Sequence, residues 1–224
     1  MNILVSGDSW GCGVWKNKQN IHKGMSWYLE NKYGHSVTNV SVAGVSNLYT
    51  YNTLKTLNLD RFDLIFTFFT NPFRDIGDTR HINYFDAPDK TLDYTYYLEL
   101  HERLAISHFT NLASLNKKIC LIGGHNKVNS KHIVSNNLIN FIPSLREFFY
   151  PSFVEPEVIY SSYIFDKYLN KFNLEALDEF SISRNYMLSL INEQAEYFFP
   201  NGYHLNQKGH LSLADYIQDL ISVI

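Results

Sequence analysis

Short runs of β-branched and aromatic residues alternate along this chain with longer segments whose apolar residues recur at helical spacing. Each run ends at glycine or at a polar turn, which is typical of a buried strand. The four clearest runs are residues 2–6, 37–43, 62–69 and 118–122, and a weaker fifth run is 157–161. The helical segments, several of which have Ser, Gly or Pro at their ends, are residues 25–33, 46–58, 95–116, 175–198 and 207–223.

The alternation of strands and helices predicts the fold class. Strands that are joined by helices lie parallel, and the helices then cover both faces of the sheet. We therefore expect an α/β fold, a three-layer α/β/α sandwich with a parallel sheet of about five strands in flavodoxin-like order. Residues 1–224 are expected to form a single domain, with two turn-rich segments, 75–94 and 124–157, inserted into it.

Candidate functional residues follow the predicted strands at their carboxyl ends. In open parallel sheets, ligands bind beyond this edge. The residues at the four ends are Ser9, Gly44, Asn71 and His125, and a further histidine, His204, precedes the last helix. Although these residues are far apart in sequence, we expect the fold to bring them to one crevice.

The chemistry of this group is that of acyl transfer, which needs a nucleophile, a base and donors for an oxyanion. Ser9 supplies a hydroxyl and His204 an imidazole. The main-chain N–H groups of Ser9 and Gly44 and the side-chain amide of Asn71 are the candidate oxyanion donors. Asp8 is interpreted as a structural cap of the turn or of the helix that follows it.

Composition narrows the class of protein. Hydrophobic residues make up 45% of the chain and charged residues 18%, which is typical of a globular protein. With a net charge of −3, the chain lacks the excess of basic residues that is typical of nucleic-acid-binding proteins. No segment is apolar over the length needed for a transmembrane helix. Cys12 and Cys120 are interpreted as reduced packing residues. With no signal-peptide pattern, we expect a cytoplasmic protein. The many Asn, Tyr, Phe, Ile and Lys residues fit an AT-rich genome, such as that of a phage or a low-GC microbe.

Several motifs resemble those of SGNH (GDSL-type) hydrolases, in the order of that family. The nucleophile turn is matched by Gly7-Asp8-Ser9-Trp10-Gly11-Cys12-Gly13, and the oxyanion glycine by Gly44. The oxyanion asparagine is matched by Asn71, although Phe69 and Pro72 stand where the family has Gly and Asp. The Asp-x-x-His motif is matched by Asn201-Gly202-Tyr203-His204, with Leu205 to His210 following it.

Asn201 departs from the family, which has Asp at this position. The carboxylate normally accepts a hydrogen bond from Nδ1–H of the histidine and stabilises the imidazolium. Three readings remain open. A Ser–His dyad operates with Asn201 or a backbone carbonyl orienting the ring, another carboxylate such as Asp75 or Asp78 replaces it, or activity is impaired and the domain mainly binds. We favour the first reading.

The resemblance implies an esterase that removes small acyl groups, acetyl above all, from a carbohydrate or a similar alcohol. The alternatives are a catalytically weak carbohydrate-binding or virion-associated domain, and an acyltransferase that uses the same site. No cofactor, metal, nucleic-acid partner or membrane is expected, and the oligomeric state stays open. His125 and Arg74 are the candidate substrate-binding residues, Arg74 because a guanidinium binds a carboxylate through two hydrogen bonds.

Overall fold

The computed structural model describes residues 1–13, 24–76, 94–124, 126–151, 196–198 and 204–222. Its five strands form one parallel sheet in the order β2-β1-β3-β4-β5, which is the flavodoxin-like order. The strands are β1 (Asn2–Ser6), β2 (Ser36–Asn39), β3 (Leu64–Phe69), β4 (Ile119–Gly123) and β5 (Leu138–Ile142). The predicted fold class is therefore confirmed.

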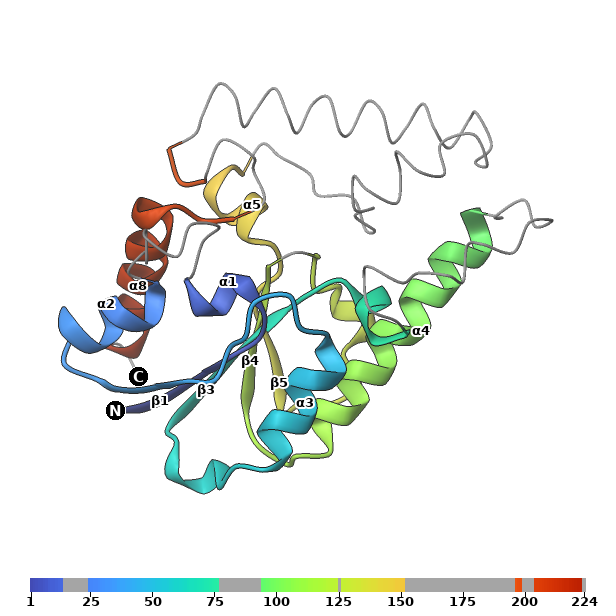
Figure 1. Ribbon diagram of the computed structural model, residues 1–224, viewed down its shortest axis with the longest axis horizontal. Coiled ribbons are helices and arrows are strands. Elements are labelled where there is room, and N and C mark those ends of the chain that lie inside the picture. Colours follow the sequence, from blue (N-terminus) through green and yellow to red (C-terminus); the bar gives the residue numbers. More distant parts are fainter. Residues whose placement is uncertain (14–23, 77–93, 125, 152–195, 199–203, 223–224) are drawn as a thin grey trace.

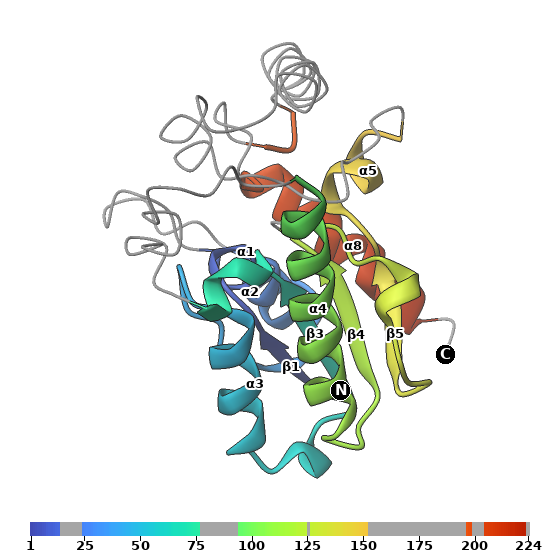
Figure 2. The ribbon, with the colours of Figure 1, turned by 90° about the vertical axis from the view of Figure 1, so that its right-hand side faces the viewer.

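Helices cover both faces of the sheet (Figures 1 and 2). One face packs against α2 (Met25–Asn31) and α8 (Gln207–Ile221), and the other against α3 (Asn47–Lys55) and α4 (Tyr94–Ala113). The remaining described helices are short, and they are α1 (Ser9–Cys12), η1 (Leu59–Arg61), η2 (Pro72–Ile76), η4 (Ser130–His132) and α5 (Leu145–Phe149).

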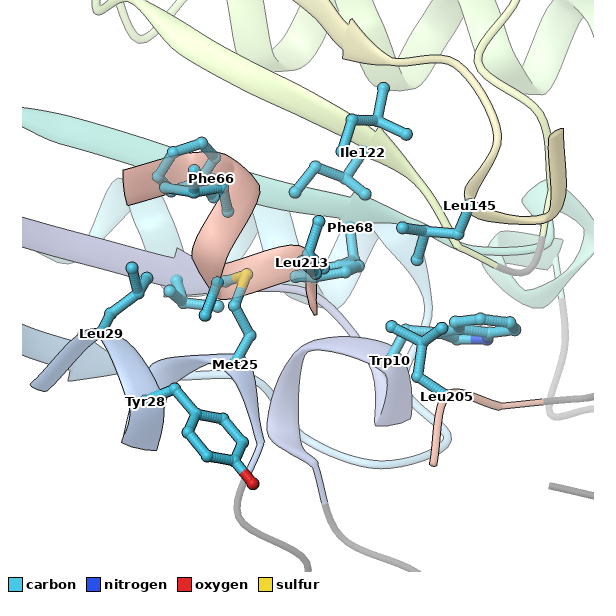
Figure 3. Packing of buried hydrophobic residues seen from close by; sticks show 14 of the residues in the cluster. Trp10, Met25, Tyr28, Leu29, Phe66, Phe68, Ile122, Leu145, Leu205 and Leu213 are labelled. Carbon is cyan, nitrogen blue, oxygen red and sulfur yellow. The ribbon is translucent and has the colours of Figure 1, made fainter. Parts of the chain in front are cut away.

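Two hydrophobic clusters fill the spaces between the layers, because successive strand residues point to opposite faces. Ile3 and Val5 of β1 pack toward α2 and α8, whereas Leu4 between them packs toward α3 and α4. Figure 3 shows the first cluster, in which Met25 of α2 and Leu213 of α8 meet the sheet residues. Both clusters consist of side chains that are almost fully buried.

The first four predicted strands are confirmed, with boundary differences of at most a few residues at either end. The fifth strand of the sheet is Leu138–Ile142, within the segment that we expected to be irregular, and it was missed. This strand lies at the edge of the sheet and only its first and last residues are buried, so its apolar pattern is weak. The predicted strand 157–161 lies outside the described residues.

The helices predicted at 25–33, 46–58, 95–116 and 207–223 are confirmed as α2, α3, α4 and α8. The predicted helix 175–198 lies outside the described residues except for 196–198, which form a turn and a β-bridge from Phe198 to Leu205 and no helix. The long loop 75–94 is described only at its two ends. Within the described part of the chain, no helix combines the length and apolar character needed to cross a membrane.

Candidate active site

Ser9 is held at the carboxyl edge of the sheet by the turn that follows β1. The turn requires glycine at residue 7, because Gly7 has φ +132° and a Cβ there would lie 2.7 Å from Phe68 Cβ. Asp8 is the N-cap of α1, and its Oδ1 accepts a hydrogen bond from the Trp10 N–H at 3.1 Å. The structural role expected for Asp8 is therefore confirmed, and Ser9 begins α1.

The hydroxyl of Ser9 meets the imidazole of His204. Ser9 Oγ and His204 Nε2 are 2.8 Å apart, although 195 positions separate the two residues in sequence. This is hydrogen-bond distance, and it is the distance at which a histidine takes a proton from a serine hydroxyl. The structure thus brings together the two groups that the sequence analysis paired.

The two residues that follow His204 fix its position. Leu205 forms an antiparallel bridge with Phe198, and the Asn206 N–H donates to the Tyr197 carbonyl at 2.8 Å. Asn206 is also the N-cap of α8, since its Oδ1 accepts from the Gly209 N–H at 3.0 Å. Its Nδ2 donates to the carbonyls of Glu196 and Phe198, so one side chain holds both the start of α8 and the segment 196–198.

The ring of Trp10 supports the imidazole directly. The two ring centroids are 5.4 Å apart with an interplanar angle of 32°. Trp10 is 2% exposed, and the guanidinium of the buried Arg146 lies 5.3 Å from its ring centroid. Figure 3 shows Trp10 beside Leu205 in the core cluster. The imidazole of His204 therefore packs against a side chain that is itself fixed in the core.

The segment that carries Gly44 is joined to the Ser9 turn. The Val42 N–H donates to the Gly7 carbonyl at 3.0 Å, and Asn39 Nδ2 donates to the Gly11 carbonyl at 2.9 Å. Gly44 has φ +80°, and a Cβ at this residue would have no atom within 4 Å. The space where a side chain would stand at Gly44 is therefore open.

Asn71 follows β3 and is 4% exposed. The residue before it is tied to α3, because Asn47 Nδ2 donates to the Thr70 carbonyl and the Thr70 N–H donates to Asn47 Oδ1, each at 3.0 Å. Asn47 is fully buried, so these two hydrogen bonds link the Gly44 and Asn71 segments in a dry environment.

Arg74 and Asp75 have partners within the protein. Arg74 Nη1 donates to Asp8 Oδ2 at 2.8 Å, where we had expected it to face a substrate. Asp75 Oδ1 accepts from the Leu48 N–H at the start of α3, so the structure directs this carboxylate to a helix terminus. Burial raises the pKa of Asp75, opposed by hydrogen bonds from Leu48, Ser46 and Asn47.

Three predicted residues, Asn201, His125 and Asp78, lie outside the described residues. Neither cysteine forms a disulfide, and burial raises the pKa of the Cys120 thiol to about 11, so it is inert at neutral pH. Among the residues that the structure describes, no three His, Cys, Asp or Glu side chains are grouped so that they could hold a metal ion.

Three residues with a direct bearing on the site were not recognised from the sequence: Trp10, Asn47 and Asn206. Asn206 carried a usable signal, because Asn directly before a helical pattern is a common N-cap. The pairing of Asn47 with Thr70 had no local signal, since it depends on the packing of α3 against the end of β3.

No family model matches this sequence, and no curated protein matches it. Among solved structures, the similar chains include the psychrotrophic esterase EstA from Pseudoalteromonas sp., with 13% identity, a TM-score of 0.44 and coverage of 99% of this chain and 96% of that chain. The lipase Lip_vut3 from a goat rumen metagenome has 9% identity, a TM-score of 0.46 and coverage of 98% and 96%. The acetylxylan esterase Axe2 from Geobacillus stearothermophilus has 15% identity, a TM-score of 0.41 and coverage of 96% and 91%.

Proposed function

We propose that this chain is a serine ester hydrolase of the SGNH type, with Ser9 as the nucleophile and His204 as the general base. The observation that carries the proposal is the 2.8 Å distance between Ser9 Oγ and His204 Nε2 at the carboxyl edge of the parallel sheet. A serine is a weak nucleophile unless a base accepts its proton. The position of the pair at the edge where ligands bind supports a catalytic role rather than a purely structural contact.

In the proposed reaction, neutral His204 accepts the hydroxyl proton at Nε2 while Ser9 Oγ forms a bond to the acyl carbon. The carbonyl π electrons move to oxygen, which becomes the oxyanion of a tetrahedral intermediate. Collapse of this intermediate breaks the ester C–O bond, and the imidazolium returns its proton to the leaving alcohol. A water molecule then repeats the sequence on the acyl-enzyme, with His204 again as the base.

The oxyanion is assigned to the N–H groups of Ser9 and Gly44 and to the side chain of Asn71. Support comes from the hydrogen bonds that hold the Gly44 segment next to the Ser9 turn, and from the open space beside Gly44 in which a ligand would fit. Loss of one such donor typically lowers kcat about 10²- to 10³-fold. Asn201, three positions before His204, is assigned to orient the imidazole through its amide oxygen, without the charge that a carboxylate would add.

The substrate is proposed to be a small acyl ester, with acetyl on a carbohydrate or a similar alcohol favoured by the motif resemblance. The experiment that tests the activity is hydrolysis of p-nitrophenyl acetate by the wild type and by Ser9→Ala, together with labelling by a fluorophosphonate and peptide mapping. We expect turnover that Ser9→Ala abolishes, and label on Ser9. Turnover that survives Ser9→Ala, or label on another residue, would contradict the assignment.

The role of Asn201 is tested by Asn201→Asp. Because a carboxylate stabilises the imidazolium that forms during the reaction, this variant is expected to raise kcat on the same ester. A wild type without turnover, combined with turnover in Asn201→Asp, would instead indicate a binding domain that has kept the crevice.

A further inference from the structure

Arg74 contacts three segments that lie side by side at the carboxyl edge of the sheet. Its Nη1 donates to Asp8 Oδ2 at 2.8 Å and to the Val45 carbonyl at 3.2 Å. Its own main-chain N–H donates to the Asn71 carbonyl at 3.1 Å. Asp8 and Val45 are sequence neighbours of two proposed oxyanion donors, and Asn71 is the third. One residue therefore links all three donor-bearing segments.

The ion pair at the centre of this link is buried. The Asp8 side chain is 0% exposed and the Arg74 side chain 17%. Asp8 Oδ2 also accepts from Thr70 Oγ1 at 2.6 Å, so the carboxylate binds the β3 end as well. A buried carboxylate without a partner is strongly unfavourable. The guanidinium of Arg74 is therefore held beside Asp8.

We propose that Arg74 is a positioning residue for ester hydrolysis. It sets the spacing of the Ser9, Gly44 and Asn71 segments, and so orients the oxyanion donors toward the substrate oxygen. This inference rests on the function proposed above. It replaces the expectation that Arg74 binds a substrate carboxylate, because Nη1 is engaged by Asp8 and Val45.

The expected kinetic signature follows from the geometry that an oxyanion requires. Donors stabilise the transition state only when they lie about 2.7–3.1 Å from the oxygen as charge develops on it. A small displacement of one segment therefore lowers kcat and leaves ground-state binding nearly unchanged. A residue that holds a substrate carboxylate would do the opposite, since its loss raises KM for anionic esters and leaves neutral esters unaffected.

The test compares Arg74→Gln with the wild type on two esters, neutral p-nitrophenyl acetate and an ester that carries a carboxylate on its acyl chain. We expect kcat to fall about 10²-fold on both esters, with KM changed by less than about two-fold. The matched control is Arg103→Gln, the same substitution at an exposed pair with Glu99 on α4, which should keep wild-type kcat. An increase in KM confined to the anionic ester would overturn the proposal in favour of substrate binding.

A second variant covers the case in which Arg74→Gln does not fold because Asp8 is left buried and unpaired. The double variant Asp8→Asn with Arg74→Gln removes both charges, and Asn serves as an N-cap as well as Asp does. It still lacks the guanidinium link to Val45, so the same loss of kcat is expected. Wild-type kcat in this folded double variant would overturn the proposal.

The outcomes separate the two proposals. A wild type without Ser9-dependent turnover refutes the proposed function, and the positioning role falls with it. An active wild type whose Arg74→Gln variant keeps full kcat refutes the positioning role alone, and Ser9 and His204 then retain their assignments.

Discussion

The indole of Trp10 lies against the imidazole of His204, with ring centroids 5.4 Å apart and an interplanar angle of 32°. Trp10 directly follows the proposed nucleophile in sequence, so one short helix, α1, supplies both the hydroxyl and the surface against which the base packs. This contact limits the rotation of the ring toward and away from Ser9.

Trp10→Phe should therefore reduce activity more than stability. The smaller ring leaves His204 less well supported, and we expect kcat for p-nitrophenyl acetate to fall between about 10- and 10²-fold, as expected of a misplaced catalytic group. Trp10→Ala would cost about 3–5 kcal/mol of unfolding free energy and is the less informative change. The control is Trp27→Phe, since Trp27 lies on α2 and is 37% exposed. Equal kcat in Trp10→Phe and the wild type would contradict this role.

Asn206→Asp separates the two functions of the Asn206 side chain. The aspartate keeps an oxygen for the Gly209 N–H, so the N-cap of α8 survives. It loses the Nδ2 donor and places an oxygen against the carbonyls of Glu196 and Phe198. We expect kcat to fall while the melting temperature changes little, because the segment 196–198, which bridges to Leu205 beside His204, is released and the helix is not.

The control for this change is Asn58→Asp, because Asn58 caps η1 through an oxygen that accepts from Asp60 N–H. This variant should keep wild-type kcat. If both variants lose activity equally, or if Asn206→Asp unfolds the protein at assay temperature, the separation of the two roles is wrong.

The Ser9–His204 pair could be predicted from strand direction and motif order together, because His204 precedes the last helix and does not itself follow a strand. Residues at the carboxyl ends of strands meet at one edge whatever the rest of the sequence is. The motif order added His204 as the proposed base. Both arguments use only strand direction and local sequence, and neither requires knowledge of side-chain conformations.

The partners of Arg74 and His210 could not be predicted in this way. Arg74 binds Asp8, which lies 66 positions earlier in the sequence, and it lies on η2, the short helix that follows β3. His210 at the start of α8 is buried, and its Nδ1 accepts from the Met25 N–H at the start of α2. Such contacts depend on how two helices pack together, which the apolar periodicity of each helix does not specify.

His108→Phe is expected to stabilise the protein and to flatten its pH dependence. The ring of His108 is buried and stacks on Phe69, with the two ring centroids 5.8 Å apart. In the described structure neither nitrogen of the His108 ring has a hydrogen-bond partner. Each unpaired buried polar group costs about 1–3 kcal/mol. Phenylalanine keeps the stacking on Phe69 and the tilted contact with Phe109, and it has no polar atom to bury.

The sign of the pH effect follows from burial, which lowers the pKa of His108 from 6.5 to about 3. Between these two values the unfolded chain binds the proton and the folded protein does not, so wild-type stability falls as the pH drops below 6.5. The loss approaches about 1.4 kcal/mol per pH unit. Urea unfolding at several pH values should show a smaller loss in His108→Phe. An equal loss in both proteins would exclude His108 as its source.

Gly44 and Gly34 provide a matched pair for testing the proposed oxyanion donor. Gly44 has φ +80° and Gly34 has φ +73°, and a Cβ at either residue would have no atom within 4 Å. Alanine is therefore strained by the backbone conformation alone, at about 1–2 kcal/mol in each case. Gly34 ends the turn after α2, whereas Gly44 lies in the segment bonded to the Ser9 turn.

Gly34→Ala and Gly44→Ala should consequently lose similar unfolding free energy but differ in catalysis. At residue 44 the strain shifts the main-chain N–H and the new methyl group occupies the open side that the substrate is proposed to use. We expect kcat for p-nitrophenyl acetate to fall by about 10²-fold in Gly44→Ala, as for the loss of one donor, and to stay at the wild-type value in Gly34→Ala. If the two variants match in kcat as well as in stability, the main chain at Gly44 does not bind the oxyanion, and the donors must be sought among Ser9, Asn71 and other groups at this edge.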